Sequence, residues 1–195
     1  AQIGFGLPSI GGKDSMSVTF NEIDVSPTLV SFAVDVAREK DIITPELKAA
    51  GNQLIHVAIA KNDYDLPVYE QVMKLYDAVH EAIQKGAVVS AYALDGKGLA
   101  AAVSKMAFGN KLGVTIEDEN VTSDMLFAPG FGNLVLEVPV AKVATLSDCL
   151  TAAGLMDYAT VVGEVNDQQK LICEDMELSM EDAIAAWSGK LEGVF

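Results

Sequence analysis

The sequence predicts an α+β fold in which helices pack on a mixed β-sheet. Amphipathic helical patterns alternate with short β-rich runs, one pair of neighbouring β-rich runs is expected to form a hairpin, and half of the 195 residues are hydrophobic. Strict alternation of strands and helices would favour a doubly wound parallel sheet, whereas an added hairpin favours a mixed sheet.

The first third of the chain is expected to hold three strands and one short helix. Residues 15–20 alternate in polarity as a short strand does, and Leu29–Val36 is β-rich enough for a buried strand. A Thr-Pro pair is typical of a helix start, so Thr44–Gly51 is predicted as a short helix that ends at its glycine. Leu54–Ala60 is the third predicted strand.

The clearest helical pattern lies at Pro67–Lys85, where apolar residues recur at spacings of three and four and Gly86 follows as the terminator. Ser179 and Asp182 form a capping box at the start of the last predicted helix. The other expected elements are strands at Ala87–Leu94, Gly113–Glu117 and Asn133–Val138, helices at Gly98–Asn110, Val140–Ala153 and Ser179–Lys190, and a hairpin of Tyr158–Val165 with Lys170–Glu174.

Composition excludes several classes of function. The net charge is −15 and the 13 basic residues are scattered, which disfavours nucleic-acid binding. Two cysteines and two histidines are too few for a zinc site or a disulfide framework, so a reduced, cytoplasmic setting is expected. No apolar stretch reaches the length of a membrane span, and no signal-peptide pattern opens the chain.

The segment Pro8–Ser17 carries the main candidate for binding chemistry. Gly11 and Gly12 allow the backbone to approach an anion, Lys13 adds a positive charge, and Asp14 and Ser15 add polar side chains. A Gly-Gly pair before a strand is also typical of a plain turn, and the spacing of a Walker loop is absent.

This segment, read with Pro27–Val34, closely resembles the second half of the phosphoribosylformylglycinamidine synthase family. Weaker matches follow in the family's order up to about residue 138. The resemblance implies the C-terminal subdomain of the AIR-synthase superfamily, cut from a longer polypeptide. Residues 1–14 would then be the tail of a preceding ATP-binding subdomain, and residues 15–195 the AIR-synthase C-terminal-like domain.

Two stretches depart from the family pattern. In Ser90–Leu99, Tyr92 stands where the family has His, Ala93 where it has a magnesium-associated Asp, and Lys97 where it has the first Gly. Asp95 is the remaining candidate for nucleotide or magnesium contact, because a carboxylate binds Mg²⁺ and alanine cannot. In Leu126–Asn133, Ala, Pro and Gly replace acidic residues.

The resemblance implies an ATP- and glutamine-dependent carbon–nitrogen ligase of purine biosynthesis. The family's catalytic ATP site lies in the other half, so this piece is expected to be inactive alone, with no catalytic residue. The expected nucleotide or phosphate contacts are Gly11, Gly12, Lys13, Asp14, Ser15 and Asp95, with ATP or ADP and Mg²⁺ as cofactors of the intact enzyme. Expected partners are the preceding ATP-binding subdomain and a glutaminase domain or subunit, and an isolated piece is expected to form a homodimer.

Other interpretations stay open at this point. The piece can be a purely structural pairing module without a ligand, which the Ala93 and Ala128–Gly130 departures favour. It can also belong to another ATP-using enzyme of the AIR-synthase superfamily. The acidic run Glu117–Glu119 is typical of a solvated loop as well as of a metal site, and His56, His80 and Cys149 fit structural positions.

Overall fold

The structure is a computed structural model, and it describes the chain except for residues 13–18, 25–29, 117–118, 120 and 192–195. The chain divides into two compact units, residues 1–42 and residues 43–195. The predicted domain boundary between residues 14 and 15 lies outside the described residues and stays a prediction. Within the described part, no helix combines the length and apolarity that crossing a membrane requires.

The first unit contains a small antiparallel hairpin. Strand β1 (Thr19–Phe20) pairs with β2 (Ile23–Asp24), and Asn21 in the turn between them has a positive φ of 54°. Residues 15–18 of the predicted first strand lie outside the described residues. A single 3₁₀ turn, η1 (Glu39–Asp41), follows near the end of the unit.

The predicted buried strand Leu29–Val36 is wrong over its described residues, 30–36. These residues belong to no strand, and all of them are exposed, among them the large apolar side chains Val30 by 62%, Phe32 by 88%, Val34 by 95% and Val36 by 94%. A β-rich pattern becomes a strand only when a neighbouring strand takes up its backbone N–H and C=O groups. The pattern at 30–36 has no such neighbour in the described chain.

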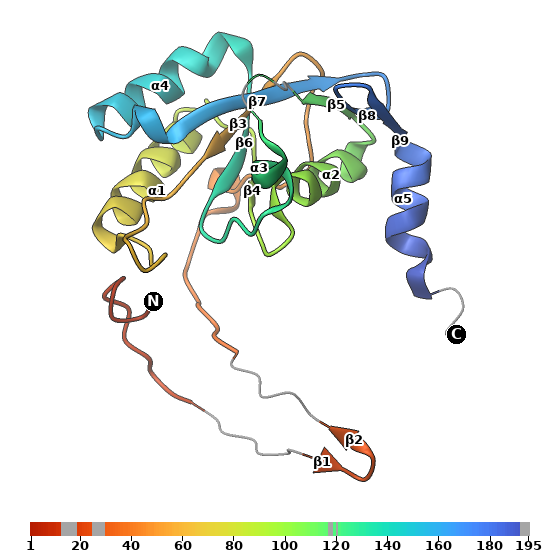
Figure 1. The fold of residues 1–195 in the computed structure, drawn as a ribbon. Coiled ribbons are helices and arrows are strands. Elements are labelled where there is room, and N and C mark those ends of the chain that lie inside the picture. The colour runs from red at the N-terminus through yellow and green to blue at the C-terminus, as the bar shows by residue number, and fades with distance from the viewer. Residues whose placement is uncertain (13–18, 25–29, 117–118, 120, 192–195) are drawn as a thin grey trace. The chain divides into compact units, whose positions relative to one another are not determined.

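The second unit is built on a seven-stranded mixed sheet in the order β4-β6-β3-β7-β5-β8-β9 (Figure 1). All neighbouring pairs are antiparallel except β5 with β8, which are parallel. This confirms the predicted α+β class. The strands are β3 (Gln53–Val57), β4 (Ser90–Ala93), β5 (Gly113–Ile116), β6 (Leu134–Val138), β7 (Ala159–Asn166), β8 (Lys170–Cys173) and β9 (Met176–Ser179).

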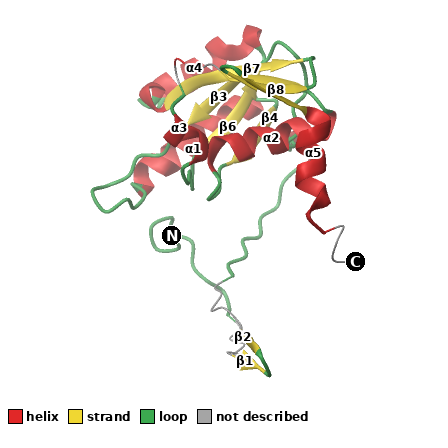
Figure 2. Ribbon diagram, turned by 45° about the vertical axis from the view of Figure 1, so that its right-hand side comes forward, coloured by secondary structure: helices red, strands yellow, loops and turns green. Residues whose placement is uncertain are grey.

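Helices cover both faces of this sheet (Figure 2). Leu54 of β3 packs into the core cluster that includes Leu99 and Met106 of α2 (Gly98–Asn110), whereas the next residue, Ile55, faces Leu146 of α4 (Val143–Ala152). Successive strand residues point to opposite faces, so α2 and α4 lie on opposite sides. Helix α1 (Tyr69–Gln84) packs beside α4.

Most of the predicted helices are confirmed within a few residues. Helix α2 has the predicted bounds, and Gly86 ends α1 with a φ of +63°. The predicted helix at Val140–Ala153 begins as a 3₁₀ turn, η3 (Val140–Lys142), before α4. Helix α5 (Met180–Ser188) starts as expected, because the Ser179 hydroxyl accepts a hydrogen bond of 3.1 Å from the Asp182 N–H. The predicted helix runs to Lys190, whereas α5 ends at Ser188 and a 3₁₀ turn, η5 (Gly189–Leu191), follows. Helix α3 (Ser123–Phe127), strand β9 and the short turn η4 (Met156–Tyr158) were not predicted.

The predicted hairpin of Tyr158–Val165 with Lys170–Glu174 is wrong. Strand β5 lies between the two strands, antiparallel to β7 and parallel to β8. Gly163 permits this insertion, because a Cβ there would lie 2.3 Å from the Thr115 carbonyl oxygen of β5. The hairpin partner of β8 is instead β9.

The predicted helix at Thr44–Gly51 is also wrong, and the reason is visible in its hydrogen bonds. The Leu47 N–H donates to the Met106 carbonyl of α2 at 2.9 Å, and the N–H groups of Lys48 and Ala49 donate to the Glu137 carboxylate of β6. Backbone N–H groups that would donate within a helix therefore donate to α2 and β6 instead. Residues 44–52 are therefore an extended segment beside one end of the sheet, and we call this segment the strap.

Candidate functional site

One end of the sheet gathers the loops that carry the candidate chemistry. Strands β3 and β4 both run antiparallel to β6, so they run parallel to each other and end on the same side. Two loops meet there: residues 95–98, which lead from β4 into α2, and residues 128–133, which lead into β6. We call them the Asp95 loop and the Gly130 loop.

Backbone contacts hold the two loops together. The Gly130 N–H donates to the Asp95 carbonyl at 3.0 Å, and the Leu94 N–H donates to the Asn133 carbonyl at 2.9 Å. Gly98 has a φ of +74°, and a Cβ there would lie 2.6 Å from the Leu126 carbonyl oxygen of α3 and 2.8 Å from the Ala128 carbonyl oxygen of the Gly130 loop. Since only glycine fits that position, the close approach of the two loops depends on it.

The side chain of Asp95 is engaged on both oxygens. Oδ1 accepts a hydrogen bond of 2.8 Å from the Lys97 N–H, and Oδ2 accepts one of 3.2 Å from Lys105 Nζ. The Lys97 N–H, and then the Lys105 ammonium, hold the pKa of the Asp95 carboxyl below its usual value. Asp95 is therefore an ionised carboxylate fixed by its own loop and by α2.

Lys105 lies between two aromatic rings. Its Nζ is 5.6 Å from the ring centroid of Tyr92 on β4 and 5.3 Å from that of Trp187 on α5. The neighbouring Tyr92 hydroxyl, and then Asp95, raise the pKa of Lys105. The lysine side chain is 21% exposed, so it is a partly buried, permanently charged ammonium.

The residues at this loop do not fit a magnesium ion. Mg²⁺ requires oxygen ligands in near-octahedral geometry, and the two Asp95 oxygens already accept other hydrogen bonds. Ala93 supplies no ligating atom. Among the described residues, no group of three or more His, Cys, Asp or Glu side chains is placed to share a metal ion.

The glycine-lysine segment near the N-terminus is only partly described. Gly11 and Gly12 are exposed, neither has a positive φ, and a Cβ on either would meet nothing within 4 Å. Lys13, Asp14 and Ser15 lie outside the described residues, so their predicted role stays a prediction.

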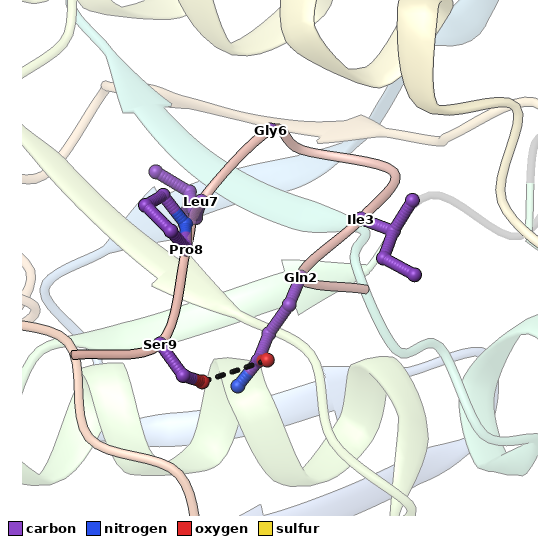
Figure 3. Close-up of a pocket in the computed structure, with 6 residues that line it drawn as sticks. All are labelled: Gln2, Ile3, Gly6, Leu7, Pro8 and Ser9. Carbon is purple, nitrogen blue, oxygen red and sulfur yellow. Dashed lines mark hydrogen bonds between the residues drawn. The ribbon is translucent and has the colours of Figure 1, made fainter. Parts of the chain in front are cut away.

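Just before this segment, the chain curls into an open hollow at residues 2–9 (Figure 3). The Ser9 hydroxyl donates to Gln2 Oε1 across it at 2.8 Å, and Ile3, Leu7 and Pro8 supply much of the rest of the lining. None of the lining residues carries a charged side chain, so the hollow has no cation for a phosphate.

The two histidines and Cys149 occupy the positions that the sequence favoured. His56 is 7% exposed on β3, and burial lowers the pKa of its imidazole. His80 is exposed on α1, and Cys149 is buried on α4.

The sequence-based prediction missed Lys105, Trp187 and Glu137. Lys105 is the only charged residue between Gly98 and Asn110, and Trp187 is the only tryptophan of the chain, so both had a recognisable signal. Glu137 interrupts an apolar strand and is fully buried, where it accepts hydrogen bonds from the strap. Nothing in the sequence pairs it with Lys48 or Asn52, some 85 to 89 positions away.

The sequence matches the family described as AIR synthase related protein, C-terminal domain, over residues 42–175. It is 27% identical to Probable membrane antigen 75 of Saimiriine herpesvirus 2, in an alignment that covers 89% of this chain and 15% of that protein. It is 26% identical to phosphoribosylformylglycinamidine synthase subunit PurL of a Sulfurovum species, covering 89% of this chain and 26% of the relative. The chain thus spans about a quarter or less of these relatives.

Solved structures show the same fold. PurLQS from Thermotoga maritima superposes with a TM-score of 0.64 at 17% identity, over 74% of this chain and 28% of that chain. T. maritima PurL complexed with ATP gives a TM-score of 0.62 at 16% identity, over 75% and 28% of the two chains. Escherichia coli HypE gives a TM-score of 0.54 at 14% identity, over 69% and 50%.

Proposed function

The chain belongs to the family of AIR synthase related proteins through their C-terminal domain, and on that premise we propose that it is a piece of a phosphoribosylformylglycinamidine synthase. The proposed parent enzyme is the ATP- and glutamine-dependent ligase of purine biosynthesis that converts formylglycinamide ribonucleotide to formylglycinamidine ribonucleotide. The PurL relative from Sulfurovum supports this assignment by its sequence, and the T. maritima structures support it by their fold. Its expected setting is the cytoplasm.

We propose further that this piece is inactive alone and contributes an auxiliary site for a nucleotide phosphate. The observation that carries this proposal is the junction of the Asp95 loop and the Gly130 loop, which only the glycine at position 98 permits. The Asp95 loop follows the carboxyl end of β4 and the Gly130 loop precedes the amino end of β6, so two loops converge at one end of the sheet, where ligand pockets commonly form. The proposed contacts are the segment Gly11–Ser15 and, separately, the Asp95 loop, where Asp95 would hold the Lys105 ammonium in place and would not touch the phosphate itself.

Calorimetry tests the auxiliary site. ADP is titrated into the 195-residue chain, into Lys13→Ala, and into Lys142→Ala as the control, because Lys142 follows the opposite end of β6 and is exposed. We expect Lys13→Ala to raise the dissociation constant at least tenfold and the control to leave it unchanged. Equal affinity of Lys13→Ala and the unaltered chain would remove Lys13 from the site.

The proposed partners are the preceding ATP-binding subdomain and a glutaminase domain or subunit, and the isolated piece is proposed to form a homodimer. The segment 30–36 exposes large apolar side chains and belongs to no strand, which favours its pairing with a second copy. A neighbouring strand would take up the backbone N–H and C=O groups of the segment. Sedimentation velocity at several protein concentrations tests the dimer. A single monomeric species at every concentration would contradict it.

A second candidate function is a structural pairing module without a ligand. Ala93 favours it, as do the hydrogen bonds that each Asp95 oxygen already accepts, and one relative bears the name of a membrane antigen and not of an enzyme. The same calorimetry separates the two candidates. Absence of any heat with ADP, together with a concentration-dependent dimer, would favour the structural module.

A further inference from the structure

Side chains from α2, β4 and α5 meet beside the Asp95 loop. Lys105 of α2 is hydrogen-bonded to Asp95, and its ammonium lies within cation–π distance of Tyr92 from β4 and Trp187 from α5. Phe108, one turn further along α2, holds the Trp187 ring at a centroid distance of 6.2 Å and an angle of 46°. The Lys105 ammonium therefore contacts a carboxylate and two aromatic rings, and its position is more restricted than that of an exposed surface lysine.

This placement matters for any cation that approaches Asp95. The carboxylate already accepts a backbone N–H on Oδ1 and the ammonium on Oδ2. A divalent ion at Asp95 would have to displace Lys105 or lie beside it, and two cations at that separation repel each other. The neighbouring Ala93 and Lys97 offer no compensating carboxylate.

We propose that Lys105 is the resident cation of the Asp95 loop, so that this site excludes divalent metal and offers an ammonium to an anionic ligand. Lys105 is then the residue that sets the ion specificity of the loop. The anionic-ligand part rests on the proposed nucleotide function, whereas the exclusion of metal does not.

The first test uses the bare metal. Trp187 is the only tryptophan and lies beside Lys105, so its fluorescence reports a paramagnetic ion bound there. Mn²⁺ is titrated into the 195-residue chain and into Asp95→Asn. We expect both proteins to show the same non-saturating quenching. Saturable quenching of the unaltered chain at submillimolar Mn²⁺, reversed by Mg²⁺ and lost in Asp95→Asn, would overturn the proposal.

The second test concerns the ammonium. ADP affinity is measured by calorimetry in EDTA and in Mg²⁺, for the unaltered chain, Lys105→Gln and Lys105→Arg, each checked for folding by far-ultraviolet circular dichroism. We expect the affinity of the unaltered chain to agree within twofold between the two buffers. Lys105→Gln should weaken it at least fivefold, and Lys105→Arg should restore it, because arginine also stacks on aromatic rings.

The two tests separate failure of this inference from failure of the proposed function. ADP binding that requires Mg²⁺, or that Lys105→Gln leaves unchanged, would overturn the role of Lys105. Absence of ADP binding in both buffers would overturn the nucleotide site, and the Mn²⁺ titration then decides whether Lys105 excludes metal.

Discussion

Replacing Glu137 by glutamine is expected to lower the free energy of unfolding by about 2 kcal/mol. Glu137 is fully buried near the end of β6, the second strand of the sheet, and its carboxylate accepts hydrogen bonds from the strap. Oε1 accepts hydrogen bonds from the Ala49 N–H at 3.1 Å and from Asn52 Nδ2 at 2.7 Å, and Oε2 accepts one from the Lys48 N–H at 2.8 Å. The strap uses these bonds in place of helical ones.

The magnitude follows from this geometry. The Lys48 N–H also donates to Oε1, at 3.0 Å. A glutamine can keep its carbonyl at the Oε1 position and retain that contact, but its amide N–H₂ then replaces Oε2, and the 2.8 Å bond from the Lys48 N–H is lost. Loss of one bond to a charged acceptor costs roughly 1.5–3 kcal/mol. Glu137→Ala leaves all three donor groups without this acceptor. Its expected cost is about 4 kcal/mol, in the range for removing one partner of a buried charged cluster.

Urea unfolding followed by far-ultraviolet circular dichroism measures these values, with Glu164→Gln as the matched control because Glu164 lies exposed on β7. The control should change the free energy of unfolding by less than about 0.5 kcal/mol. Hydrogen exchange at the Leu47 and Gly51 amides should accelerate in Glu137→Gln, since both amides bond from the strap to other elements. A Glu137→Gln protein as stable as the control, with unchanged exchange at these amides, would refute the role of the carboxylate.

Two further predictions concern the loops and the buried histidine. Gly98→Ala is expected to lower the free energy of unfolding by roughly 2 kcal/mol or more beyond the effect of its control, Gly154→Ala. Both glycines have a positive φ, so both variants carry the strain of a left-handed alanine. Only at Gly98 would the new Cβ also meet a carbonyl oxygen. Similar unfolding midpoints in urea for the two variants would contradict this. Burial lowers the pKa of His56, so the unfolded chain binds a proton at this imidazole more readily than the folded chain does. The free energy of unfolding should therefore fall as the pH drops below the unfolded pKa of about 6.5. The slope should be at most about 1.4 kcal/mol per pH unit. His56→Leu should lose this slope, whereas replacement of the exposed His80 by Gln should keep it; a slope that His56→Leu retains would show that another group causes it.

Local patterns were sufficient for the elements whose stabilising contacts are close in sequence. The apolar spacing of α1 and the glycine after it specify a helix and its end, because residues three and four apart share one helix face. The predicted mixed sheet is also present, but it was inferred from a hairpin of Tyr158–Val165 with Lys170–Glu174 that the structure does not contain. The glycine-rich loop before α2 and its Asp95 were also recognisable as candidate site residues from the sequence.

Only the tertiary structure decided which distant groups meet. Strand order is set by pairing between strands that are remote in sequence. The sequence around β7 and β8 therefore could not predict that β5 lies between them. The strap is extended because its N–H groups find Met106 and Glu137, and residues 30–36 stay unpaired because no described strand lies beside them. Likewise, Lys105 lies beside Trp187 only because α2 and α5 pack together, and helix packing depends on surfaces that no single segment encodes.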